Sequence, residues 1–358
     1  TFASGFAFLP TLILNIIERP VGYIKYCVVA MVCSFVFPVL LMGWFQHGVF
    51  GVQLGILVAA IVAFLAGLFM IRNYFTVCMD REVIRDVLLF AAPAFPHLFL
   101  GTMFRYVDRI FVGSASGMGA VGVYSLAASL SSILLIVQSG GLSALNPLFF
   151  RTILADPTAL KIQWRRVTAY YGYASIWMGL GFAALGPDLI RLLAPANYNE
   201  AIPILPVLIL GQLIYGFHGV FTSTFGHFRK MWVFPVVSSL SFGLVFILNR
   251  LFIPWWGLMG AAVAMLVSSV FYAAAFWFAA ESFFSVSYRI FRVALALSVA
   301  LALFVMIQYV PVDFGFFCWV AKLVLVGTFP LLIWGCGFLP KDEKDLFKLK
   351  WSAAWHRC

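Results

Sequence analysis

Long apolar runs recur along the whole chain, and they constrain its fold more than any other feature. Uncharged runs of about 20 residues, such as residues 27–45 and 52–71, follow one another with only short polar turns between them. Such a run is long enough to cross the hydrocarbon core of a bilayer as a helix. With 64% hydrophobic and 10% charged residues, the composition excludes an ordinary soluble domain. We therefore predict an all-α, polytopic transmembrane helical bundle with about eleven spans.

The placement of positive charge predicts the orientation of this bundle. Most of the 23 Lys and Arg residues fall in one alternating set of loops and chain ends, whereas Arg191 and Arg250 lie in the opposite set. The positive-inside rule assigns the basic side, which includes the C-terminus, to the cytoplasm. No soluble module carries a basic face, so we expect no nucleic-acid partner.

One predicted span carries an unusual number of polar groups. The segment 86–113 is apolar enough to cross a membrane, yet it contains His97, Arg105, Asp108 and Arg109. At 100° per residue, these side chains fall within an arc of roughly 120° on a helix. A charge near the centre of a membrane helix costs about 2.5–3.5 kcal/mol. We therefore expect the stripe to face a protein interior or a wet cavity, and we take it as the candidate substrate site.

An internal repeat is also visible. Residues 48–75 align with residues 257–284, because GVFG matches GLMG, both copies continue through a run rich in small residues, and NYF corresponds to SFF. Both copies are predicted to run from outside to inside, so the repeat is parallel and indicates two pseudo-symmetric lobes with a substrate path between them. The alternative is a chance alignment of two apolar spans that contain glycine.

Several segments together resemble a known superfamily. They are a proline-interrupted span that ends YVDRIFVG (106–113), then GAVGVYSLAASLSSIL (119–134), LNPLFFR (145–151), and the longer stretches 192–216 and 228–268. Their order and spacing over roughly residues 8–285 resemble the multidrug/oligosaccharidyl-lipid/polysaccharide exporter superfamily, and most closely its polysaccharide (O-antigen type) flippases.

The resemblance implies two six-helix lobes followed by an extra helix pair. On that plan residues 1–71 are the last three helices of an N-terminal lobe, which is incomplete here, and some three further helices are expected to precede them. The segment 72–86 is then a cytoplasmic linker and residues 87–284 are the six-helix C-terminal lobe. An extra transmembrane hairpin occupies 285–339, and 340–358 form a basic amphipathic tail.

The resemblance also implies a substrate, which is an undecaprenyl-pyrophosphate-linked oligosaccharide that crosses the bacterial inner membrane. Implied partners are this lipid-linked oligosaccharide, membrane lipids, and the polysaccharide polymerase and chain-length machinery. Arginine suits a diphosphate, because its planar fork of donors makes bidentate contacts. Arg105 and Arg109 are therefore candidates to hold the pyrophosphate, with Asp108 orienting Arg105. The alternative is an ion pair between Arg105 and Asp108, with Arg109 extending to the outer interface.

Three further side chains are weaker candidates for substrate contact. Lys25 borders the predicted cytoplasmic face, where it is either a site that attracts a lipid phosphate or an ordinary positive-inside charge. Lys322 lies within the last span, where it either contacts substrate or extends to the interface. His97 either titrates and couples transport to protons, or is a hydrogen-bonded residue beside Pro96.

Other classes of function remain as alternatives. A cation-coupled multidrug or metabolite exporter of the same fold needs carboxylates within its spans, and Asp108 is the one that the sequence places there. A membrane glycan polymerase or ligase needs a large outer loop with catalytic Arg or His, and the longest predicted outer loop, 186–201, holds one Arg and no His. The six cysteines show no CxxC or metal-binding spacing. We therefore expect no enzyme activity, no cofactor and no metal.

Overall fold

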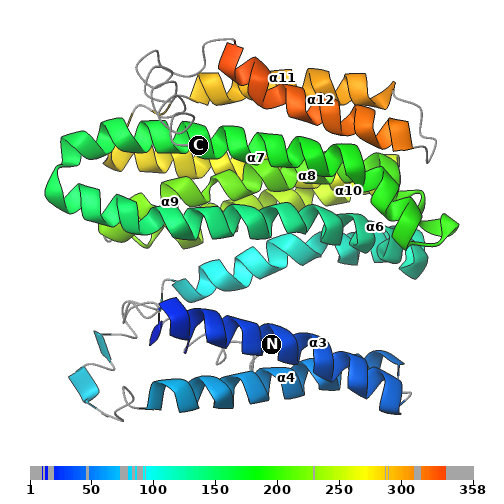
Figure 1. Ribbon diagram of the computed structural model, residues 1–358, viewed down its shortest axis with the longest axis horizontal. Coiled ribbons are helices and arrows are strands. Elements are labelled where there is room, and N and C mark those ends of the chain that lie inside the picture. Colours follow the sequence, from blue (N-terminus) through cyan, green and yellow to red (C-terminus); the bar gives the residue numbers. More distant parts are fainter. Residues whose placement is uncertain are drawn as a thin grey trace, which may run out of the picture. The chain divides into compact units, whose positions relative to one another are not determined.

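The computed structural model describes residues 10, 13–14, 20–45, 48–72, 80–82, 85–86, 92, 94–228, 230–286, 288, 290–309 and 316–335. These residues form helices and connecting turns, with no strand among them (Figure 1). Most of the helices are long and apolar enough to cross a membrane. The predicted all-α transmembrane fold is therefore confirmed. The chain divides into two compact units, residues 1–85 and 86–358, which are described separately below.

The first unit contains a closely packed pair of helices. Helix α3 spans Pro20–Phe45 and α4 spans Gly48–Ile71. A Cβ on Gly55 would overlap the backbone of Pro38, so a glycine is needed where the two helices approach each other. The polar segment 18–26 suggests a short cytoplasmic turn from sequence, but α3 already begins at Pro20, in the first helical turn that proline favours.

The second unit begins with a helical hairpin, α6, which spans Ala94–Ala155. Gly117 interrupts it with φ 81°, a left-handed conformation that glycine tolerates and other residues avoid. The Nε of Arg109 lies 3.0 Å from the Oγ of Ser125, whereas in a straight helix residues this far apart in sequence would be separated by about 24 Å. The chain therefore folds back at Gly117, and the two halves of α6 lie side by side (Figure 1).

Helix α10, Val233–Phe283, is a second hairpin of this kind, with Gly257 at φ 55°. The segment 249–256 suggests an outer turn from sequence, but these residues continue the helix and Asn249 is fully buried. A Cβ on Gly260 would overlap the carbonyl oxygen of Phe252, and a Cβ on Gly51 in α4 would lie 2.9 Å from the carbonyl oxygen of Leu41. Gly51 and Gly260 hold equivalent places in the predicted repeat, so both copies use a glycine where a hairpin closes.

Helices α7 and α8 complete the centre of this unit. α7 spans Pro157–Leu193, a 3-10 turn covers Ala196–Tyr198, and α8 spans Ala201–Phe217. The predicted loop at 186–201 is therefore only partly a loop, because α7 continues through its first half and buries Asp188. His218 separates α8 from the short helix α9, Gly219–His227.

The last two described helices form a hairpin on the surface of the second unit. α11 spans Ile290–Gln308 and α12 spans Phe316–Gly335, and both pack against α7 (Figure 1). A continuous core of buried apolar side chains joins α6, α7, α8, α10, α11 and α12. Because α6 and α10 are two spans each, the architecture is consistent with about eleven spans in total.

Candidate functional site

Asp108 lies inside the second unit. Its side chain is 3% exposed, and it accepts hydrogen bonds from the hydroxyl of Tyr124 at 2.7 Å and from the Nδ2 of Asn249 at 2.8 Å. These donors come from the second half of α6 and from α10, so a single carboxylate ties three spans together. Its oxygens face neutral donors, and no ion pair joins Asp108 to Arg105. The ion pair considered from the sequence is therefore not formed.

Arg109 is half-buried between the two halves of α6. Its Nε donates to the Oγ of Ser125 at 3.0 Å, and its guanidinium carbon lies 4.7 Å from the centre of the Tyr106 ring. Cation–π contact and a single hydrogen bond hold this side chain in place while other guanidinium N–H groups remain available as donors. Arg109 is thus anchored at its base and can still bind an anion.

Arg105 lies on the exposed face of the second unit, half-way between Ala94 and Gly117. Leu98, two turns before Arg105 on the same face of the helix, is 66% exposed. A charge at this depth is costly against acyl chains. Within the second unit Arg105 is therefore not shielded from its surroundings, and its charge requires contact with water or with another part of the protein rather than with lipid.

Small hydroxylated residues lie beside the two arginines. The two halves of α6 run antiparallel, and Arg109 lies opposite Ser125. Arg105 is one helical turn before Arg109, and Ser129 is one turn after Ser125, so Arg105 and Ser129 lie level with each other. Ser129 is exposed. Together Arg105, Arg109, Ser125 and Ser129 form what we call the α6 polar patch.

His97 lies outside the α6 polar patch. Its Nδ1 is 2.6 Å from the Oγ of Ser238 on α10, and its ring packs edge-on against Phe234. A second histidine, His218, is in contact with the Tyr215 carbonyl and with the ring of Tyr272, at the break between α8 and α9. The position of His97 matches the hydrogen-bonded residue considered above, and it contacts α10 rather than either arginine.

The two lysine candidates have different surroundings. Lys322 is 5% exposed, and its Nζ lies 2.6 Å from the Oδ2 of Asp188 on α7, so it is engaged inside the second unit. Lys25 is exposed on the second turn of α3, in the first unit. Neither lysine is therefore part of the α6 polar patch.

The sequence alone did not identify three of these partners. Asn249 and Asp188 were placed in predicted loops, and Tyr124 was one aromatic residue among many. A usable signal existed for Asp188, since Arg191 follows it by three residues and LIRLL continues the helical pattern beyond Pro187. Within the described parts of the chain, no three His, Cys, Asp or Glu side chains gather as metal ligands.

The predicted resemblance to the multidrug/oligosaccharidyl-lipid/polysaccharide exporter superfamily agrees with a family match over part of the chain and with the folds of two solved structures. Residues 7–153 match the family described as "Polysaccharide biosynthesis protein". None of the curated protein sequences matches the chain.

Two solved structures share the fold at low sequence identity. The lipid II flippase MurJ, in an inward closed conformation, superimposes with a TM-score of 0.72 and 14% identity, over 96% of this chain and 72% of that one. The MATE transporter VcmN of Vibrio cholerae, in a mutant form, superimposes with a TM-score of 0.61 and 16% identity, over 77% of this chain and 65% of that one. The protein is thus a multi-pass membrane protein whose fold is similar to those of MurJ and VcmN.

Proposed function

We propose that the protein is a flippase for undecaprenyl-pyrophosphate-linked oligosaccharides in the bacterial inner membrane, where it serves the synthesis of a surface polysaccharide. The observation that carries this proposal is Arg105, a permanently charged side chain exposed half-way along a membrane span. The polysaccharide-biosynthesis match over residues 7–153 supports a glycan substrate, and the fold supports transport rather than catalysis.

The chemistry of the α6 polar patch suits a diphosphate head group. The guanidinium of Arg105 has no carboxylate partner among the described residues of the second unit. Arg109 lies one turn away and is held by its hydrogen bond to Ser125 and its cation–π contact with Tyr106. Two guanidinium groups at this spacing match two linked phosphates, each of which accepts paired hydrogen bonds. Ser129, at the depth of Arg105, supplies a neutral hydroxyl.

Asp108 serves this site indirectly. The carboxylate binds Tyr124 and Asn249, and so it fixes the second half of α6 and the adjoining part of α10 against the helix that carries both arginines. Transport by alternating access would then move this hairpin as one piece. Lys25 attracts the lipid phosphate at the cytoplasmic surface, and the C-terminal tail faces the same compartment.

A direct assay tests the proposal. The full-length protein is reconstituted in vesicles with an undecaprenyl-diphosphate-linked oligosaccharide, and flipping is followed as loss of protection from an added glycosidase. We expect flipping by the parent protein and a loss of roughly 10–100-fold in Arg105→Ala, because a hydrogen bond to a charged group contributes about 1.5–3 kcal/mol. Arg105→Lys keeps the charge but not the fork and should be intermediate.

Arg250→Ala is the matched control, since it removes another exposed arginine from the same unit and should leave flipping unchanged. Full activity of Arg105→Ala at normal protein levels would remove the arginine from the mechanism. A parent protein that leaves the lipid-linked oligosaccharide on its original leaflet would overturn the proposed function itself.

A cation-coupled exporter is the second candidate, because the fold also matches a MATE transporter and α7 adds a second buried carboxylate, Asp188, to Asp108. Both carboxylates already have partners, Lys322 for one and Tyr124 with Asn249 for the other. Efflux of a cationic dye driven by a proton or sodium gradient, abolished in Asp108→Asn, would favour this candidate.

A further inference from the structure

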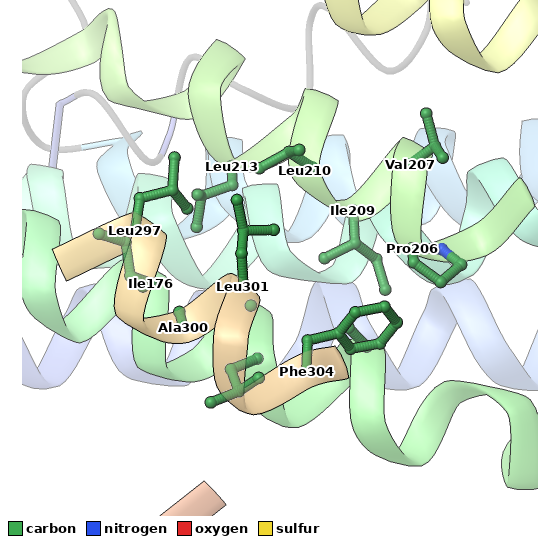
Figure 2. Close-up of a pocket in the computed structure, with 13 residues that line it drawn as sticks. Ile176, Pro206, Val207, Ile209, Leu210, Leu213, Leu297, Ala300, Leu301 and Phe304 are labelled. Atoms are coloured by element: carbon green, nitrogen blue, oxygen red, sulfur yellow. The ribbon is translucent and has the colours of Figure 1, made fainter. Parts of the chain in front are cut away.

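A long groove runs along the seam between α7, α8 and α11, and α10 lines one end of it. It consists of three adjoining cavities of about 380, 200 and 450 Å³. Leu213 and Leu297 line both the first and the second cavity, and Pro206 and Phe304 line both the second and the third. Figure 2 shows the middle cavity, where Leu297, Ala300, Leu301 and Phe304 of α11 face Pro206, Ile209 and Leu210 of α8.

The groove is about as long as a bilayer core is thick. Its lining residues follow the helices in order, from Gly172 of α7 and Ile290 of α11 at one end to Arg191 and Gln308 at the other. The helical rise of 1.5 Å per residue makes the stretch from Gly172 to Arg191 about 28 Å long. A typical hydrocarbon core measures about 30 Å.

The lining is apolar for most of this length and cationic at one end. The first two cavities are lined almost wholly by aliphatic and aromatic side chains, whereas Arg191, Gln308 and Lys322 line the third. Lys322 is paired with Asp188 at 2.6 Å, and no described carboxylate pairs with Arg191. The third cavity therefore has a positive charge to offer to a ligand, at the end that the charge pattern predicts to be the outer one.

The dimensions and chemistry of the groove limit its occupant. Ordered water is unfavourable in the groove, because it would find no polar partners along the apolar walls. An empty groove is also unfavourable, because the lining side chains would lose dispersion contacts. A helix, about 10 Å across, does not fit between α7 and α11, because these two helices pack directly against each other along the seam. A single hydrocarbon chain suits the apolar lining of the groove.

We propose that this groove binds one anionic phospholipid, with its phosphate on Arg191 and one acyl chain along α7, α8 and α11. The guanidinium supplies paired donors for a phosphate, and Gln308 adds an amide donor beside it. The lipid fills the seam between the C-terminal hairpin and the rest of the second unit. The proposal does not depend on the substrate of the α6 polar patch, which lies on other helix faces.

The test measures lipid retained by the full-length protein. The protein is delipidated in detergent, phosphatidylglycerol or phosphatidylcholine is added back, and bound lipid is counted by native mass spectrometry. We expect one phosphatidylglycerol per chain, held at least tenfold more tightly than phosphatidylcholine. Arg191→Gln should reduce phosphatidylglycerol retention at least tenfold and remove the preference.

Two further variants make the result specific. Arg250→Gln removes the other arginine that the charge pattern places on the outer side, and because this residue does not line the groove, retention should be unchanged. Leu301→Trp fills the middle cavity with the head-group site intact, and it should reduce retention of both lipids. Unchanged retention in Arg191→Gln and Leu301→Trp, or an equal loss in Arg250→Gln, would overturn the proposal. Displacement of phosphatidylglycerol by undecaprenyl phosphate at equal concentration would overturn it too, by assigning the groove to an isoprenoid chain.

Discussion

The buried ion pair between Lys322 and Asp188 gives a quantitative prediction. Its nitrogen and oxygen lie 2.6 Å apart, and both side chains are 6% exposed. Lys322→Met keeps the length of the side chain but leaves the Asp188 carboxylate in an apolar seam without a counter-charge. Breaking a buried pair from one side costs about 3–5 kcal/mol. For a unit of this size each kcal/mol lowers the melting temperature by about 2–4 °C, so we expect a fall of roughly 10 °C.

The assay is thermal unfolding of the purified protein in detergent, followed by intrinsic tryptophan fluorescence. The double variant Lys322→Met/Asp188→Leu should recover most of the loss, because replacing both partners of a buried pair with apolar residues is often neutral. Lys230→Met, at an exposed lysine, controls for loss of charge and should change little. The ion pair does not hold α12 to α7 if Lys322→Met has the melting temperature of the parent protein, or if the double variant has a melting temperature no higher than that of the single variant.

Two other predictions concern the hairpins of the second unit. Asn249→Leu removes a hydrogen bond to the buried carboxylate of Asp108 and should destabilise the protein by about 1.5–3 kcal/mol, whereas Arg250→Leu, its exposed neighbour, should have little effect in the same unfolding assay. Gly260→Ala should cost about 1–3 kcal/mol, because its methyl group would overlap the Phe252 carbonyl. Gly243→Ala, with open space around it, should gain up to about 1 kcal/mol from helix propensity, so equal unfolding temperatures for the two alanine variants would contradict the overlap.

The sequence was sufficient to predict the helical membrane fold, because a bilayer imposes a length and an apolar composition on every span. It was less informative about where helices end. Turns were predicted around Pro20 and Pro187, yet proline is accepted in the first turn of α3 and inside α7. A turn was also predicted at 249–256, but the chain reverses direction only at Gly257.

The candidate site shows a second limit of prediction from sequence. Periodicity grouped Arg105, Asp108 and Arg109 on one side of a helix, but it could not say which part of that arc faces inward. Arg105 and Asp108 differ by only about 60° around the helix axis. That difference is enough to place Asp108 among its donors and Arg105 on the surface. The partners of Asp108 and Lys322 include residues more than 130 positions away, which no local pattern reveals.

The glycine reversals in α6 and α10 have a consequence for how the protein meets its surroundings. Where Gly117 and Gly257 turn the chain, one span ends and the next begins with no intervening loop. Proteases, antibodies and inserted epitope tags require an accessible loop, and the chain has no loop at either of these two reversals. In the second unit, residues 194–200 connect α7 to α8 near the Gly117 reversal, so this connection is the natural place to insert a tag or attach a label.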